Sequence, residues 1–279
     1  MTDVTYHEMS VEELGEVLSW AAAEGWNPGL DDASAFHTAD RAGFFMARRD
    51  GDPVAAISVV NHDAENAFLG LYICRPEWRG KGIGYALWNH ALTHAGERSV
   101  GLDGVPEQEA NYAISGFVRT GRSLRHEGRW PAGHSGRVRA AKVEDGEALI
   151  ALDTAANGFA RPEFMTTWID GAPGSRETRV LEHVGEVAGF ATWRACGEGT
   201  KIGPIVAPTR DDALELIADI AELRPDGKLI VDVPEANEAL CRALEGAGFE
   251  MSFATARMYR GAVPEVGPGL QAIATMELG

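Results

Sequence analysis

Hydrophobic residues recur along the first half of the chain with two different periods, which predict alternating helices and strands. The first helix begins at Ser10, which forms a capping box with Glu13 and precedes an apolar face of Leu14, Val17 and Leu18. Shorter apolar runs between Gly, Pro and Asp turns predict strands. The expected elements follow in the order strands 43–49, 54–60 and 67–74, helix 83–95, strand 99–102, helix 106–115 and strand 117–124.

The second half repeats this order after a segment rich in Gly, Pro and polar residues at 125–136, which we interpret as a domain linker. Both halves end a helix with Gly-Phe, at Gly116 and Gly248, and then begin a strand. An internal duplication into two domains, 1–130 and 137–279, is the simplest explanation. The expected elements are strand 138–142, helix 145–156, strands 178–183, 187–196 and 201–207, helix 211–223, strand 229–233, helix 235–247 and strand 249–259.

Composition and charge narrow the functional classes. Hydrophobic residues make up 45% and charged residues 24% of the chain, which is typical of a folded globular protein. The net charge of −17 is spread over both halves without a basic cluster, so we expect no nucleic-acid partner. The chain has no run of eighteen apolar residues, and its first residues lack the basic segment followed by an apolar one that is typical of a signal peptide. We therefore expect a cytoplasmic protein without a membrane partner. Its three cysteines lack the spacing of a zinc site, and we expect no metal.

The chemistry is predicted where the strand 67–74 leads into the helix 83–95. Gly80, Gly82 and Gly84 stand there at intervals of two, with Arg79 and Lys81 beside them. Glycines let the backbone approach a ligand closely, and the first amides of a helix have no partner within the helix. The segment therefore predicts a cradle for a pyrophosphate. A Walker A loop would need Ser or Thr after GK, and a dinucleotide fingerprint would follow the first strand, so neither fits.

This segment resembles the R/Q-x-x-G-x-G/A signature of the GNAT acetyltransferase superfamily, and Tyr112 with Gly116-Phe117 resembles the family's Y-x-x-x-G-F motif. Segments at 101–105 and 256–261 are similar to a bacterial subset with two such domains. The resemblance implies an α/β (α+β) fold of tandem GNAT-like domains, each with a mixed, mostly antiparallel central sheet flanked by helices. It also implies acetyl-CoA as co-substrate.

The resemblance implies roles for individual residues. The main chain of Ile73 and Cys74 would pair with the pantetheine arm of the co-substrate, and Tyr112 would return a proton to its thiolate. The family's Asn seven residues before this tyrosine is replaced by Val105. The pyrophosphate would be held by the segment Arg79, Gly80, Lys81, Gly82, Ile83, Gly84 and Tyr85.

The acceptor side is less well marked. Asp103 ends the strand opposite the cofactor strand and is a candidate base, although turn formation is the alternative role. We expect acceptor contacts from Trp26, Asn27, Asp31 and Asp32, which lie in and after the WNPG turn. The second domain lacks the glycine triplet and has Leu244 at the tyrosine position, so we expect it to bind no CoA.

We therefore expect an N-acetyltransferase that acts on a primary amine of a small molecule, by direct attack in a ternary complex, as a monomer or homodimer. Two alternatives stay open: acetylation of a protein lysine or N-terminus, and a non-catalytic regulatory module that binds acyl-CoA.

Overall fold

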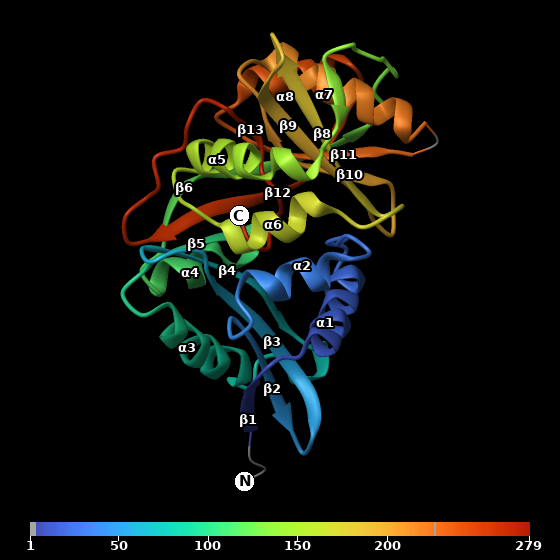
Figure 1. Ribbon diagram of the computed structural model, residues 1–279. Coiled ribbons are helices and arrows are strands. Elements are labelled where there is room, and N and C mark those ends of the chain that lie inside the picture. The colour runs from blue at the N-terminus through green and yellow to red at the C-terminus, as the bar shows by residue number, and fades with distance from the viewer. Residues whose placement is uncertain (1–3, 226) are drawn as a thin grey trace.

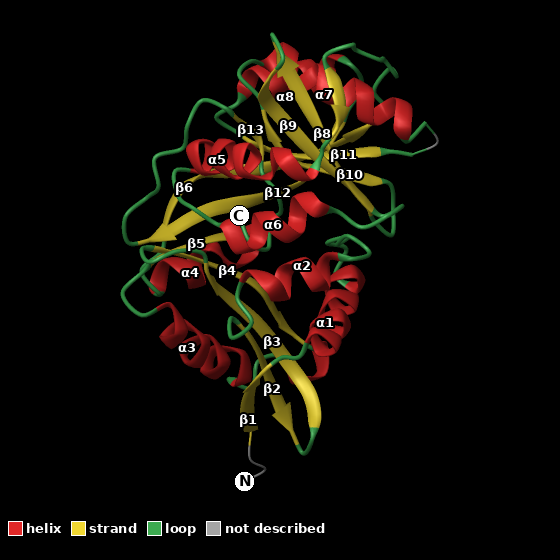
Figure 2. Cartoon of the chain, viewed as in Figure 1, coloured by secondary structure: helices red, strands yellow, loops and turns green. Residues whose placement is uncertain are grey.

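The computed structural model describes residues 4–225 and 227–279. A continuous sheet runs through the molecule in the strand order β1-β2-β3-β4-β5-β12-β6-β11-β10-β9-β8-β7, and β13 pairs with β10 beside it. Helices cover this sheet, with the first half of the chain at one end and the second half at the other (Figures 1 and 2). The predicted class, a mixed and mostly antiparallel sheet flanked by helices, is confirmed.

Each half contributes its own series of elements. The first half contains β1 (Val4–Glu8), α1 (Val11–Ala23), α2 (Asp32–Ala39), β2 (Phe44–Arg49), β3 (Asp52–Asn61), β4 (Asn66–Cys74), α3 (Ile83–Ala95), β5 (Ser99–Gly104), α4 (Glu109–Ile114) and β6 (Val118–Gly128). The second half contains β7 (Val138–Ala140), α5 (Gly146–Asn157), α6 (Pro162–Asp170), β8 (Arg176–His183), β9 (Glu186–Ala195), β10 (Thr200–Val206), α7 (Arg210–Leu223), β11 (Leu229–Pro234), α8 (Glu238–Gly246), β12 (Glu250–Arg260) and β13 (Leu270–Ala272).

The two halves exchange their last long strands. β12 lies in the first half's part of the sheet, antiparallel to β5, with Ala256 opposite Gly104. β6 in turn pairs antiparallel with β11, with Leu124 opposite Val233. β6 and β12 then pair with each other at the centre of the sheet. Because equivalent strands lie on either side of this central pair, the halves are related by an approximate twofold axis and neither completes its sheet alone.

The predicted linker at 125–136 is too long by several residues, because β6 continues to Gly128. The later residues of β6 pair with β11, a strand of the second half. No local sequence pattern predicts this pairing. Four elements were not predicted: β1, α2, α6 and β13. In α2, where a loop was expected, short side chains such as Ala33 and Ala35 carry little helical pattern, and the preceding Asp31 makes no side-chain cap. β13 is only three residues long.

Two parallel strand pairs splay apart at equivalent places. β4 and β5 stay paired from Asn66 opposite Ser99 to Leu69 opposite Leu102, and beyond that point β4 runs on to Cys74 without β5. In the second half, β10 and β11 separate in the same way after Ile202, but β13 pairs with the freed part of β10. The first splay is therefore open, whereas the second is filled by the chain itself.

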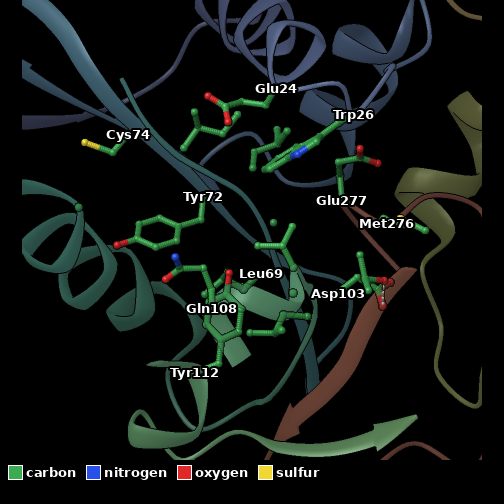
Figure 3. A pocket seen from close by; sticks show the side chains of 18 of the residues that line it. Glu24, Trp26, Leu69, Tyr72, Cys74, Asp103, Gln108, Tyr112, Met276 and Glu277 are labelled. Atoms are coloured by element: carbon green, nitrogen blue, oxygen red, sulfur yellow. Dashed lines mark hydrogen bonds between the residues drawn. The ribbon is translucent and has the colours of Figure 1, made fainter. Parts of the chain in front are cut away.

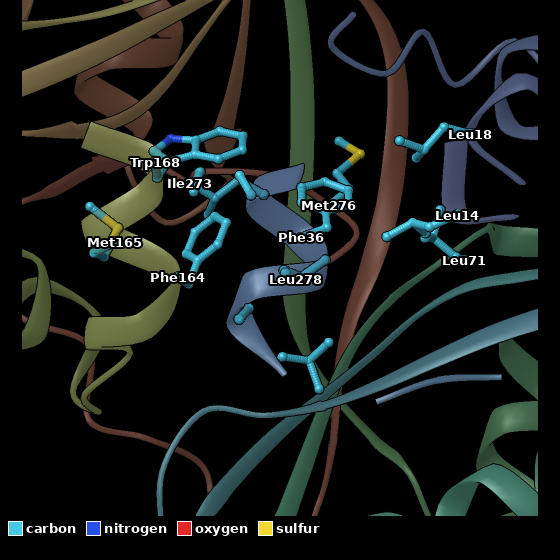
Figure 4. Packing of buried hydrophobic residues seen from close by; sticks show 14 of the residues in the cluster. Leu14, Leu18, Phe36, Leu71, Phe164, Met165, Trp168, Ile273, Met276 and Leu278 are labelled. Carbon is cyan, nitrogen blue, oxygen red and sulfur yellow. The ribbon is translucent and has the colours of Figure 1, made fainter. Parts of the chain in front are cut away.

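One hydrophobic cluster joins the halves. It contains Leu14 and Phe36 from the first half, Phe164 and Trp168 from α6, and Leu278 from the end of the described chain (Figure 4). The rings of Phe36 and Trp168 stack with centroids 6.1 Å apart. Burial of such side chains contributes about 1.5–3 kcal/mol each, so this shared core holds the halves together.

Residues 273–279 thread between the halves and are buried. The Ile273 amide donates to the Asp232 carbonyl oxygen at 3.0 Å, and His62 Nε2 donates to the Leu278 carbonyl oxygen at 2.8 Å. A Cβ on Gly70 of β4 would lie 2.1 Å from the Glu277 carbonyl oxygen, so the close passage of the tail requires glycine there. The tail is a structural part of both halves.

Buried ion pairs also connect the halves. Arg125 of β6 donates to Asp232 of β11 through two hydrogen bonds of 2.8 and 2.9 Å. Arg176 of β8 donates to Asp31 and Asp32 at 2.9 and 2.8 Å. Breaking a buried pair leaves an uncompensated charge and costs about 3–5 kcal/mol, so these contacts oppose separation of the halves.

The strand exchange predicts that residues 1–130 do not fold alone. Without β12, β5 and β6 lose the strand between them, and both present unpaired edges. We expect the isolated fragment to be unfolded or aggregated in circular dichroism and gel filtration, while the whole chain melts in one cooperative transition. A monomeric fragment with a native-like spectrum would contradict the account.

The pair between Arg125 and Asp232 predicts acid sensitivity. Burial by itself raises the pKa of Asp232, but the adjacent Arg125 guanidinium lowers it to about 2. The ordinary value is about 3.9, so this carboxylate contributes stability above about pH 4 that is lost as pH falls towards 2, on the order of 2 kcal/mol. Asp232→Asn should therefore lower the free energy of unfolding at pH 7 by about 3 kcal/mol and flatten its fall between pH 5 and 2.

Urea titrations at several pH values measure both effects. Asp211→Asn, at a side chain that is 78% exposed, is the matched control and should keep the wild-type profile. An equally steep acid loss in Asp232→Asn would refute the role of this pair.

Candidate active site

A cavity of about 520 Å³ lies where β4 and β5 separate. Its lining begins at the glycine loop after β4, follows the free edge of β4, and reaches the junction with the second half. Tyr72 and Tyr112 lie on one side, and Trp26 and Glu277 lie across the cavity from them (Figure 3). The separation of two parallel strands thus produces the cavity.

The glycine loop at one end needs its glycines for two reasons. Gly80 and Gly82 have φ of +73° and +79°, the left-handed region that costs other residues strain. Gly84 faces Tyr72, whose hydroxyl would lie 2.8 Å from a Cβ at this position. Gly82 is the N-cap of α3 and supplies no side chain to cap it. The first-turn amides of α3 are therefore not covered by a cap side chain, as an anion-binding helix start requires.

The two cations of the loop are held by neighbouring groups. Arg79 Nε donates to the Cys74 carbonyl oxygen at 2.8 Å, and its guanidinium pairs with Glu24, which caps the C-terminus of α1. The Lys81 ammonium lies 4.3 Å from the centroid of the Trp78 ring. Both side chains are exposed, so they place positive charge beside the glycine loop.

The edge of β4 forms the long side of the cavity. Ile73 and Cys74 pair with Ala56 and Ala55 of β3 on one side, while β5 has already diverged on the other. The register shifts between Ala56 and Ser58, and Leu71 takes φ of +46°. This bulge bends the free edge along the cavity. Unpaired backbone groups there can hydrogen-bond an extended ligand as another strand would.

Tyr112 of α4 is fixed by its neighbours. Its ring stacks on Trp88 of α3, with centroids 5.5 Å apart and planes 17° apart. A Cβ on Gly104 would lie 2.2 Å from this ring, so glycine at the end of β5 makes room for it. The side chain is 8% exposed and its hydroxyl points into the cavity (Figure 3). Burial, reinforced by nearby Tyr72, raises the pKa of Tyr112 above its ordinary value.

Asp103 lines the cavity, but its carboxylate is already engaged. Arg257 of β12 donates to both of its oxygens at 3.0 and 2.6 Å, and the hydroxyls of Ser123 and Thr255 donate at 3.0 and 3.2 Å. This geometry anchors β12 and β6 beside β5. The arrangement favours the structural alternative for Asp103 over the candidate base.

The four residues expected on the acceptor side separate into two groups. Trp26 lines the cavity. Asn27 instead faces the second half, where its side-chain amide donates to the Glu198 carbonyl oxygen at 2.8 Å. Asp31 and Asp32 bind Arg176, and Asp32 also lies 3.4 Å from Arg194. Of these four, the structure brings only Trp26 to the cofactor residues.

The far end of the cavity is built by residues that the sequence did not single out. β6 supplies Arg125, β12 supplies Phe253 and Thr255, and the tail supplies Met276 and Glu277. They reach the cavity only because the strands are exchanged and the tail threads between the halves. No local motif marks them, so only the tertiary fold reveals them.

Gln108 is a further residue that sequence reasoning missed. It lines the main cavity and an adjoining one of about 370 Å³ between α3 and α4, which Asn111 also lines. The Asn111 amide donates to Gln108 Oε1 at 2.7 Å. Gln108 stands four residues before Tyr112, one helical turn away, and this spacing could have identified it. Val105, which stands where the family motif has asparagine, lines the main cavity as well.

The equivalent place in the second half is closed. Thr209 caps α7, accepting from the Asp212 amide at 3.2 Å, and its hydroxyl donates to the Asp212 carboxylate at 2.7 Å. β13 fills the splay beside β10. Leu244, at the position of the tyrosine, is fully buried.

Residues 4–225 and 227–279 contain no group of three or more His, Cys, Asp or Glu side chains arranged to hold a metal ion. They also contain no helix whose length and apolar character would let it cross a bilayer.

Comparisons with known proteins agree with this architecture. An acetyltransferase (GNAT) family model matches residues 11–113, and an acetyltransferase (GNAT) domain model matches residues 149–266. Holothin acyltransferase from Pseudoalteromonas sp. (strain SANK 73390) is 34% identical over 275 residues, which cover 97% of this chain and 92% of that protein. The uncharacterised N-acetyltransferase YitH from Bacillus subtilis (strain 168) is 24% identical over 186 residues, 65% of each chain.

Solved structures show the same fold. A crystal structure from Pyrococcus horikoshii superposes with a TM-score of 0.83 at 17% identity, over 99% of this chain and 96% of that one. A tandem GNAT protein from the clavulanic acid biosynthesis pathway superposes with a TM-score of 0.63 at 14% identity, over 92% and 98%. Two family models and a relative matched along almost the whole chain confirm the family that the sequence predicted: the protein belongs to the GNAT acetyltransferases, as an acyltransferase with two such domains in tandem.

Proposed function

We propose that this protein transfers an acetyl group from acetyl-CoA to a primary amine of a small molecule. One observation carries the proposal. A single cavity joins the glycine loop, the free edge of β4 and the hydroxyl of Tyr112, and it ends against a wall from the second half. These parts suffice to hold a long phosphorylated donor at one end and a small acceptor at the other.

Acetyl-CoA, the co-substrate of GNAT enzymes, fits the residues present. The amides from Gly80 to Tyr85 would hold its pyrophosphate, since Gly80 and Gly82 adopt left-handed conformations and leave the start of α3 without a cap side chain. Arg79 and Lys81 would add charge there. The main chain of Ile73 and Cys74 would bind the arm along the free edge of β4. We assign Gln108 and Asn111 to the wall that faces β4 across the bound arm.

Tyr112 would donate its proton to the sulfur that leaves when the amine attacks the thioester carbonyl. Burial holds the pKa of Tyr112 above its usual range, so the phenol stays protonated. The same burial raises the pKa of a thiol formed beside it, so proton transfer between the two remains balanced. Trp88 and Gly104 keep the ring in place for this transfer.

The far end of the cavity supports a small acceptor, because side chains from an exchanged strand and a buried tail, Phe253, Met276 and Glu277, line it. The relative at 34% identity is named holothin acyltransferase, which supports acyl transfer by this chain. The second half would serve as the wall of the acceptor site, with its own splay filled by β13.

The donor site is tested by Gly82→Ala. At φ of +79° an alanine adds roughly 1–2 kcal/mol of strain, so we expect the dissociation constant for acetyl-CoA to rise by about tenfold in calorimetric titration. Gly185→Ala is the matched control, because Gly185 has φ of +82° with open space around it in the turn between β8 and β9. The proposal fails here if the two variants bind acetyl-CoA equally well.

The catalytic assignment is tested by thiol release from acetyl-CoA across polyamines, aminoglycosides, amino acids, arylalkylamines and short peptides. For the amine that is used, Tyr112→Phe should lower kcat by about 10²–10⁴-fold while acetyl-CoA binding persists, because the variant lacks only the proton. Tyr6→Phe, far from the cavity on β1, is the control and should match wild type. Full activity of Tyr112→Phe would exclude the assignment; tight acetyl-CoA binding with no turnover on any amine would favour the regulatory module.

A further inference from the structure

We propose that Glu277 binds the acceptor's ammonium and takes its proton, and that the acceptor carries this one amine on a compact apolar body. The inference rests on the proposed function and deepens it by naming the acceptor class and the base. Three observations support it: the position of Glu277, the engagement of the other acids of the cavity, and the apolar walls around it.

Glu277 is a buried carboxylate at the acceptor end of the cavity. It is 5% exposed, lines the cavity, and lies beside Trp26, across from Tyr72 (Figure 3). The Thr275 hydroxyl donates to its carboxylate, and the Glu277 amide donates to the Thr275 hydroxyl oxygen at 3.0 Å. The close contact with Gly70 fixes its backbone against β4. The side chain is therefore held in place by the threaded tail.

The other two acids of the cavity are already engaged. Asp103 accepts four hydrogen bonds, including two from Arg257. Glu24 pairs with Arg79 at the donor end. Glu277 accepts from the small hydroxyl of Thr275 and keeps lone pairs for a ligand.

Three cations from other elements interact electrostatically with Glu277: Arg125 on β6, Arg194 on β9 and Lys201 on β10. Each of the three also has another protein partner. Arg125 pairs with Asp232, Arg194 pairs with Asp32, and Lys201 donates to the Trp26 carbonyl oxygen at 3.1 Å. Arg125 donates to the same oxygen at 3.1 Å. These two donors fix Trp26 at the cavity wall.

Apolar groups form the walls near Glu277. The lining includes Trp26 from the first half, Phe253 from β12 and Met276 from the tail. A second ammonium on the acceptor would be buried against these groups without a partner, and a carboxylate would meet only Arg125, which is already paired with Asp232. Either charge would cost several kcal/mol. The walls therefore select a flat or compact apolar body with a single amine.

The position of Glu277 permits the proton transfer. Its carboxylate is held at the cavity wall by Thr275 and can accept a hydrogen bond, and then a proton, from an ammonium beside it. One proton passes from the ammonium to Glu277, and the amine lone pair forms the N–C bond to the acyl group. The C–S bond breaks, the sulfur takes the proton of Tyr112, and the second proton of the nitrogen restores the Tyr112 hydroxyl. Glu277 then returns its proton to solvent, so the products are the amide, the thiol and one proton.

The acceptor class is tested with three probes on the wild-type protein. 2-Phenylethylamine carries one amine on an apolar body, phenylalanine adds a carboxylate to it, and spermidine replaces the body with further amines. We expect kcat/KM in thiol release to be at least about tenfold higher for 2-phenylethylamine than for either other probe, as one unpaired buried charge requires. Equal or better use of spermidine or phenylalanine would overturn the acceptor class.

The role of Glu277 is tested by Glu277→Gln with Glu238→Gln as the matched control, since Glu238 is exposed on α8. Glu277→Gln should lower kcat/KM by about 100-fold, the usual contribution of a positioned base. In calorimetry on protein saturated with coenzyme A, it should weaken binding of 2-phenylethylamine about tenfold. Affinity for acetyl-CoA should not change. Wild-type kcat/KM and amine binding in a folded Glu277→Gln would refute the assignment.

Thr275→Val keeps the carboxylate and the volume of the side chain but removes the hydroxyl that positions it. It should fall between wild type and Glu277→Gln in both amine binding and kcat/KM, and this expectation holds even if Glu277→Gln does not fold. A Thr275→Val protein equal to wild type in both readouts would count against the positioning. Absence of turnover by wild type with every amine would instead overturn the proposed function, so the two failures are distinguishable.

Discussion

The antiparallel pairing of β6 with β12 is the interaction on which the rest of the structure depends. By sequence β6 belongs to the first half, yet its other neighbour is β11 of the second half. Likewise β12 belongs to the second half, and its other neighbour is β5 of the first half. Separating the two strands would therefore open both halves of the sheet. The exchange also brings Arg125 and Phe253 to a cavity whose donor end belongs to the first half. Fold stability and assembly of the site thus rely on the same strand pair.

Two equivalent splays in this sheet have different contents. The splay between β4 and β5 opens into the cavity, whereas the chain fills the splay between β10 and β11 with β13. After β13 the chain continues into the junction and delivers Met276 and Glu277 to the open site. One segment therefore closes the second half and completes the first. This asymmetry explains how two copies of a fold can form one open cavity at a splay and one filled splay.

The sequence predicted much of the fold and one end of the site. Periodicity placed most long helices and strands, and local motifs singled out the glycine triplet and Tyr112, which the structure brings to one cavity. The acceptor end depends on contacts between segments more than 100 residues apart, such as Arg125 with Asp232. The spacing of residues along the sequence does not predict these contacts. Asp31 and Asp32 stood near the right place, but the arginines that bind them lie in the other half.

A crystal structure of the protein with coenzyme A tests the central claim most directly, because the claim is that one open splay makes one donor site. The account predicts the pyrophosphate at the amides from Gly80 to Tyr85, the arm along β4 from Gly70 to Cys74, and the sulfur near the Tyr112 hydroxyl. β13 should remain in the second splay. Coenzyme A bound in the second half, or with β13 displaced from β10, would contradict the account.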